Sequence, residues 1–380
     1  MLENLEPAEK IESSPEFRPG ITFDGTEGEA TTPALDSPSF DEWLRGAGFD
    51  PDEVEIIGEP RISQWQKYDG EWLTAYRFRF RKKNKDIDFP RLHKEAKKKV
   101  KVSPVKAAEE KALVVLWSDL QVGKVDYRGG SEALVQRVAE TRKKLIAQIK
   151  REKPSKVIFC DLGDTVENFS NANANQQAYS NDLSIMEQVE LAIEFAFETI
   201  RDIYKLVPDM TYASVGSNHC QFRLNKQQVG KPTDDWGVFI GRQLARMAKT
   251  AEMKIKFTEP QPHDESLAID VFGDKHHILG MVHGHQARRP DQMATFWRQQ
   301  QFGHGALRDA TLLVHGHWHH LRVTELGSTH TGGSRFLVMA PTLDNGSGWW
   351  RLTTGEDSVP GLGTIVLEKG VNYTGTVYKL

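Results

Sequence analysis

Apolar runs and amphipathic stretches alternate along the chain from about residue 111 onward. Five short apolar runs have the length and composition of buried strands, and they lie at 112–117, 156–160, 211–215, 278–282 and 310–314. Between them, apolar side chains recur at helical spacing over 131–152, 184–207, 234–253 and about 290–303. Strands that alternate with helices predict an α/β domain with the helices outside, and the pattern after residue 320 predicts strands and turns.

The part of the chain before this alternation has a different pattern. Residues 1–38 are rich in Glu, Pro, Ser, Thr and Gly with little periodicity, so we expect most of them to be disordered. Residues 39–82 predict a small α+β module, in which a tight hairpin turn precedes an alternating strand at 72–80. We expect 83–110 to be a basic linker and 111–380 to form the main domain.

Charge is distributed unevenly along the chain. The 380 residues carry a formal net charge of -4, which gives no overall sign of nucleic-acid binding. Residues 81–106, however, hold a large excess of Lys and Arg, and they adjoin Arg77 and Arg79 on one side of the preceding strand. We expect this segment either to contact the phosphates of a nucleic acid or to be a solvated linker. A protein partner or self-association stays open.

Cysteine content and hydropathy indicate the compartment. Two cysteines, Cys160 and Cys220, do not form a disulfide framework. The N-terminus is acidic and lacks the apolar core of a signal peptide, and no apolar run reaches the about 18 residues that span a bilayer. We therefore expect a cytoplasmic protein without membrane contact.

Each of the five predicted strands is followed by Asp, Asn, Gln or His. The candidates are Asp119, Gln121, Asp164, Asn218, His219, His283, His317 and His319. Because ligands bind outside the carboxyl ends of strands in open α/β sheets, we expect these side chains to gather there. One such residue would be an ordinary turn former, but turns do not explain five strand ends in succession. The donors suit manganese, iron, zinc or magnesium, and their number exceeds what one ion requires.

In chain order these residues resemble the five motifs of the calcineurin-like metallophosphoesterases, D-x-H, G-D, G-N-H-D/E, H and G-H-x-H. The corresponding positions here are 119–121, 163–164, 217–220, 283 and 316–319. The resemblance covers roughly 112–345 and implies a four-layer αββα sandwich. Within the superfamily the chain looks most similar to SbcD-type DNA exonucleases and to metallophosphoesterases of tailed phages. For a phage protein, the expected location is the host-cell cytoplasm.

The resemblance also implies a role for each residue. Asp164 would bridge two divalent ions. The ligands that complete one ion would be Asp119, Gln121 and His319, and those of the other would be Asn218, His283 and His317. A hydroxide activated by both ions would attack phosphorus, with His219 as general acid or charge stabiliser at the leaving oxygen. We expect Arg223 either to contact a substrate phosphate or to lie in a solvated loop.

Gln121 departs from the family pattern, which has His at this position. An amide oxygen binds a metal less tightly than imidazole and favours a harder ion, so manganese is the expected cofactor, with iron, zinc and magnesium as alternatives. Ser217 stands where Gly is usual, and Cys220 stands where an acid is usual.

The function that this pattern predicts is metal-dependent hydrolysis of phosphodiester bonds, with DNA as the substrate of an exonuclease or endonuclease. The arginine that phosphoprotein phosphatases carry shortly after G-D is absent from 165–168. One alternative is a phosphodiesterase for a cyclic nucleotide or a nucleotide-derived diester. Another is a non-catalytic binding module on a degenerate scaffold, which Gln121 favours.

Overall fold

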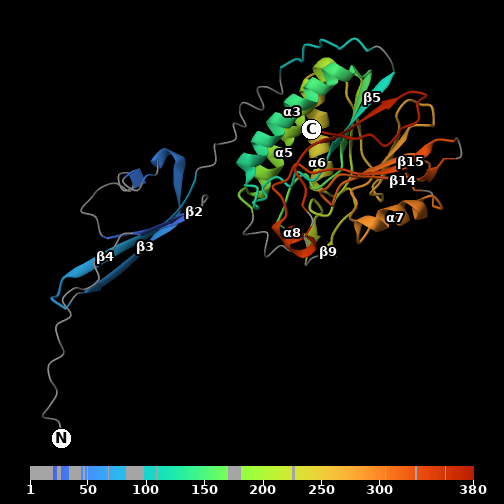
Figure 1. Ribbon diagram of the computed structural model, residues 1–380. Coiled ribbons are helices and arrows are strands. Elements are labelled where there is room, and N and C mark those ends of the chain that lie inside the picture. Colours follow the sequence, from blue (N-terminus) through green and yellow to red (C-terminus); the bar gives the residue numbers. More distant parts are fainter. Residues whose placement is uncertain are drawn as a thin grey trace, which may run out of the picture. The chain divides into compact units, whose positions relative to one another are not determined.

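The structure is a computed structural model that divides into two units, Met1–Ile87 and Asp88–Leu380, each described by itself (Figure 1). The residues that it describes are 20–23, 27–33, 44–45, 48, 50–66, 68–82, 98–107, 110–169, 181–224, 227–303, 305–329, 332–355 and 357–380.

The N-terminal unit contains an antiparallel four-stranded sheet in the order β1-β2-β4-β3. Its strands are β1 (Gly20–Phe23), β2 (Glu27–Pro33), β3 (Val54–Gln66) and β4 (Trp72–Lys82). The β3–β4 hairpin confirms the predicted turn. On β4, Arg77 and Arg79 are exposed, and Arg77 Nε lies 3.2 Å from Glu29 Oε1 of β2.

Strands β1 and β2 correct part of our expectation for residues 1–38. We expected disorder there, but β2 pairs with β4 along its whole length. This pairing satisfies the backbone hydrogen bonds of β2. The segment is polar and has little periodicity, so its side-chain pattern does not indicate a strand. Residues 34–43 and the centre of the basic segment, 83–97, lie outside the described residues.

The second unit is mixed α/β and begins with a six-stranded sheet in the order β10-β7-β6-β5-β16-β17. Its strands are β5 (Lys111–Trp117), β6 (Lys156–Asp161), β7 (Met210–Ser214), β10 (Lys256–Thr258), β16 (Gly363–Glu368) and β17 (Tyr378–Lys379). Strands β5, β6, β7 and β10 are parallel, whereas β16 runs antiparallel to β5.

A second sheet has five strands in the order β11-β12-β13-β15-β14. Its strands are β11 (Leu267–Asp270), β12 (Ile278–Met281), β13 (Leu312–His315), β14 (Arg322–Ser328) and β15 (Ser334–Met339). Strands β12, β13 and β15 are parallel. The five predicted strands are therefore all present, but three lie in one sheet and two in the other. Two short strands, β8 (Arg223–Leu224) and β9 (Gln227–Gln228), pair separately.

The predicted helices are present, the first with the predicted bounds and the other three slightly shorter. They are α3 (Ser131–Glu152), α5 (Ile185–Leu206), α6 (Trp236–Thr250) and α7 (Met293–Gln300), the last preceded by a 3-10 turn, Pro290–Gln292. A capping box of Ser184 and Glu187 begins α5, and Asp235 caps α6. Helix α8 (Gly348–Thr354) was not predicted, and Ser347 caps it. None of the described helices is long and apolar enough to cross a membrane.

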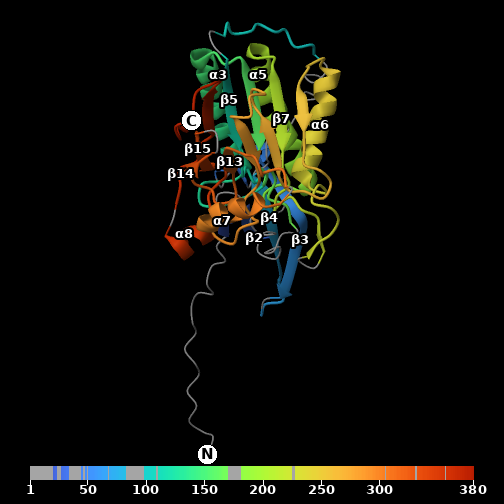
Figure 2. The same ribbon diagram turned by 90° about the vertical axis from the view of Figure 1, so that its right-hand side faces the viewer.

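The two sheets share one apolar core. Leu116 of β5, Met281 of β12 and Val314 of β13 belong to this cluster. Because alternate residues of a strand face opposite sides, Leu313 points away from it and packs instead with Trp297 of α7. Figures 1 and 2 show α3, α5 and α6 on one side of the unit and α7 on the other. This packing holds the parallel strands of both sheets in place. The loops that follow these strands carry the residues of the candidate site.

Candidate metal centre

Tight backbone reversals follow the strands that carry the candidate ligands. Positive φ angles of 51°, 45°, 47°, 74° and 61° occur at Asp119, Gln121, Asp164, His317 and His319, respectively. Non-glycine residues seldom adopt this left-handed region, and such strain persists only where the surroundings enforce it. The backbone at these five positions is therefore held in place by the loops around it.

Two glycines allow the loops to approach each other. A Cβ at Gly316 would lie 2.1 Å from Ser118 Oγ and 2.4 Å from Asp119 Oδ2. A Cβ at Gly163, where φ is +94°, would lie 2.4 Å from Ser217 Cβ. Any side chain would therefore separate the loops that carry the ligands.

Asp164, His283 and His317 form a compact group of ligand atoms, all within 4.8 Å of one another. His283 Nε2 lies 3.0 Å from Asp164 Oδ2 and 3.0 Å from Asn218 Oδ1. The other ring nitrogen, Nδ1, lies 2.7 Å from Leu162 O. A carbonyl oxygen accepts only, so Nδ1 carries a proton and Nε2 is left to face the two oxygens.

These four residues fit a divalent cation. Asp164 Oδ2 is buried and faces His283 Nε2 at 3.0 Å, and no hydroxyl, amide or backbone N–H of the described residues donates to it. A buried carboxylate that faces a ring nitrogen needs either a shared proton or a metal ion between them. One carboxylate, one amide and two imidazoles are a ligand set that manganese, iron or zinc accepts.

The protonation of this group depends strongly on Asp164. Burial disfavours the charged His283 ring, but the attraction of Asp164 outweighs it and raises the pKa of His283 to about 9. Burial and the repulsion of His283 lower the pKa of His317. A metal ion binds only unprotonated imidazole, so an incoming ion must displace the His283 proton.

His219 lies beside this group and is held by two acidic residues. Its backbone N–H donates to Asp164 Oδ1 at 2.9 Å, and its Nε2 lies 4.0 Å from Asp164 Oδ2. Its Nδ1 lies 3.2 Å from Glu167 Oε2. Although burial opposes it, attraction by Asp164 and Glu167 raises the pKa of His219. Sequence reasoning missed Glu167, whose position shortly after the G-D motif was the available signal.

Asp119 and His319 lie together in a second group. Asp119 accepts hydrogen bonds from the His317 N–H at 3.0 Å and from Ser118 Oγ. His319 Nε2 is 3.4 Å from Asp119 Oδ1, and its Nδ1 is 3.1 Å from Asp344 Oδ2. Despite burial, the attraction of Asp344 and Asp119 raises the pKa of His319 to about 10.

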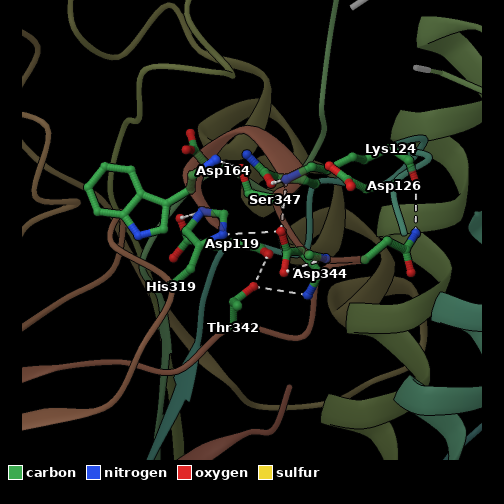
Figure 3. A network of polar contacts seen from close by, with 12 residues as sticks. Asp119, Lys124, Asp126, Asp164, His319, Thr342, Asp344 and Ser347 are labelled. Atoms are coloured by element: carbon green, nitrogen blue, oxygen red, sulfur yellow. Dashed lines mark hydrogen bonds and ion pairs between the residues drawn. The ribbon is translucent and has the colours of Figure 1, made fainter. Parts of the chain in front are cut away.

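Gln121 joins this second group through a buried lysine. Lys124 Nζ lies 2.6 Å from Gln121 Oε1. It also lies 2.9 Å from Asp344 Oδ2 (Figure 3). On its other side, Gln121 Nε2 lies 3.3 Å from His219 Nε2. Burial opposes the charge of Lys124, yet the attraction of Asp344 raises its pKa.

The loop after β15 brings Asp344 into the site. Thr342 Oγ1 donates to Asp119 O at 2.6 Å, and Asn345 Nδ2 donates to Lys124 O at 2.7 Å. Arg137 of α3 donates to the Asp344 carbonyl. Sequence reasoning missed both Lys124 and Asp344. Asp344 follows a buried strand, as the predicted ligands do, so this signal was present, whereas no pattern marked Lys124.

Arg223 is the predicted substrate contact. It lies in β8, and one of its terminal nitrogens donates to Gln221 Oε1 at 3.0 Å. Its Nε is buried and has no hydrogen-bond partner among the described residues. Both cysteines, Cys160 and Cys220, are buried and free.

No protein-family model and no curated protein matches this chain.

Proposed function

We propose that the chain is a metal-dependent phosphodiesterase that acts on nucleic acid, with DNA as its foremost substrate. The observation that carries this proposal is the convergence of Asp164, His283 and His317, whose ligand atoms lie within 4.8 Å of one another, with Asn218 Oδ1 3.0 Å from His283 Nε2. These residues come from four loops of two sheets, and a divalent cation would satisfy the buried oxygens and ring nitrogens that meet there.

The chemistry would be divided between the ion and the chain. A bound divalent ion supplies Lewis acidity toward a phosphoryl oxygen and lowers the pKa of water. His219 supplies the proton: as the bond from phosphorus to the leaving oxygen breaks, the proton moves from Nε2 to that oxygen. Glu167 holds Nδ1 and so directs Nε2 toward Asp164 and the reaction.

The packing of the second unit supports the resemblance to the calcineurin-like metallophosphoesterases. Helices α3, α5 and α6, the six-stranded sheet, the five-stranded sheet and α7 follow one another in space. This order supports a four-layer αββα sandwich, in which the site lies at the carboxyl ends of the parallel strands.

Nucleic acid is the proposed partner for two reasons. The basic segment 81–106 adjoins the exposed Arg77 and Arg79. In addition, Trp318 lies against the candidate ligand His317, with ring centroids 4.7 Å apart, and against Trp350 at 5.8 Å. Aromatic rings beside a phosphoryl-transfer site offer stacking surfaces for bases.

The test compares wild type with Asp164→Ala in the presence of Mn²⁺. The substrates are bis-p-nitrophenyl phosphate, a cyclic nucleotide, and linear single- and double-stranded DNA. Asp291→Asn, an exposed acid near α7, is the matched control. We expect wild type and control to cleave DNA and the simple diester. Cleavage of diesters without DNA would favour the small-molecule alternative, and equal activity of wild type and Asp164→Ala would refute an enzyme.

A further inference from the structure

The two halves of the site differ in how their ligand atoms are occupied. Around Asp164 Oδ2, the buried acceptor atoms have no side-chain cation of the Lys or Arg type among the described residues. Gln121 is the predicted ligand of a second ion, and its side-chain oxygen already accepts a hydrogen bond from the Lys124 ammonium. This difference bears on the number of ions that the site holds.

Lys124 fixes the orientation of the Gln121 amide. An ammonium group has hydrogen atoms to donate and no lone pair, so the amide must turn its oxygen toward Lys124 Nζ, 2.6 Å away. The amide nitrogen then faces His219 at 3.3 Å. The oxygen that would ligate a metal is therefore used by Lys124.

Asp344 fixes Lys124 in turn. Its Oδ2 lies 2.9 Å from Lys124 Nζ and 3.1 Å from His319 Nδ1, so one carboxylate oxygen joins both side chains (Figure 3). The loop is anchored by Thr342 on the Asp119 carbonyl. Lys124 is buried, and its charge is paired by Asp344. Its ammonium is thus a fixed positive charge rather than a mobile surface group.

We propose that the chain binds a single divalent ion, held by Asp164, Asn218, His283 and His317, and that the Lys124 ammonium takes the electrostatic place of a second ion. This inference rests on the proposed function. A second ion at Asp119 and His319 would lack the Gln121 oxygen and would lie near the Lys124 charge, which repels it.

Metal counting tests the proposal on the wild-type protein. The metal-free protein is dialysed against excess Mn²⁺, and bound manganese is measured by elemental analysis. We expect one ion per chain and the electron paramagnetic resonance spectrum of an isolated Mn²⁺. Two ions with an exchange-coupled spectrum would overturn the proposal. No bound ion would instead refute the proposed metal-dependent function, so the two failures are distinguishable.

A pair of variants tests the role of Lys124. Gln121→His alone adds an imidazole but keeps the ammonium, so we expect it still to bind one ion. Gln121→His combined with Lys124→Ala removes the ammonium, and we expect two ions and a coupled spectrum. Two ions in the single variant, or one ion in a folded double variant, would overturn the role assigned to Lys124. Circular dichroism checks folding, and the wild-type count decides the stoichiometry if the double variant unfolds.

Discussion

Glu167 Oε2 lies 3.2 Å from His219 Nδ1, on the side of the ring opposite to the Nε2 that approaches Asp164. The carboxylate therefore orients the ring and stabilises its protonated form. This is the arrangement expected of a histidine that donates a proton from Nε2.

His219→Asn should reveal this proton transfer through its dependence on the leaving group. A dinucleotide releases an alkoxide, which needs a proton, so we expect its turnover to fall by about 10²–10⁴-fold. p-Nitrophenolate leaves without a proton, so hydrolysis of bis-p-nitrophenyl phosphate should fall far less. Steady-state rates on both substrates measure the ratio, and Mn²⁺ binding by the variant serves as control. Equal losses on both substrates would contradict the assignment.

Metal affinity should depend on pH through His283. Although burial favours the neutral ring, Asp164 raises the pKa of His283 to about 9 in the metal-free site, so the ring is protonated at neutral pH. Each ion must displace that proton, and affinity should therefore rise by about tenfold per pH unit up to about pH 9. Calorimetry in buffers of different ionisation enthalpy counts the proton released. His276→Asn, at an exposed histidine, should leave the slope unchanged.

Gly316→Ala should destabilise the second unit and disturb the site. The added Cβ would lie 2.1 Å from Ser118 Oγ and 2.4 Å from Asp119 Oδ2, so a loop must move. Overpacking of this kind costs about 1–3 kcal/mol, which urea denaturation measures. The exposed Gly303 has no neighbour of its Cβ position closer than 3.8 Å, so Gly303→Ala is the matched control with little expected change. Similar stability of both variants would show that the close approach is unimportant.

Deletion of residues 1–97 should separate DNA binding from catalysis. The deletion keeps 98–107 because Ser103 and Val105 donate backbone hydrogen bonds to Lys205 and Leu206 of the second unit. It removes Arg77, Arg79 and most of the basic segment, so DNA affinity and its salt dependence should fall. Turnover of bis-p-nitrophenyl phosphate should persist. An equal loss of both would refute this division between the units.

The sequence predicted the main strands and helices of the second unit because their periods are regular and their ends are marked. Polar residues follow each buried strand, as expected, and Asp235 marks the start of α6 as its cap. It did not predict the sheet formed by β1 and β2 with β4, since cross-strand pairing depends on partners distant in sequence. Helix α8 is too short for its periodicity to stand out against the strands around it.

The candidate site was predicted in part, because its ligands follow strands that the sequence marks clearly. Asp164, Asn218, His283 and His317 meet as their positions after strands suggested. The contact of Gln121 with Lys124 could not be predicted, because it depends on Asp344, which is more than two hundred positions away in the chain. A buried ion pair between distant residues leaves no local pattern.

The antiparallel pairing of β16 with β5 affects the order in which the protein can assemble on the ribosome. Strand β5 leads into Asp119, yet its neighbour Gly363–Glu368 is made near the end of the described chain. Until then β5 has a free edge, and the fold depends on contacts between segments that are synthesised far apart in time. A nascent chain therefore cannot complete the first sheet, or the support beneath Asp119, before translation of the second unit is almost finished.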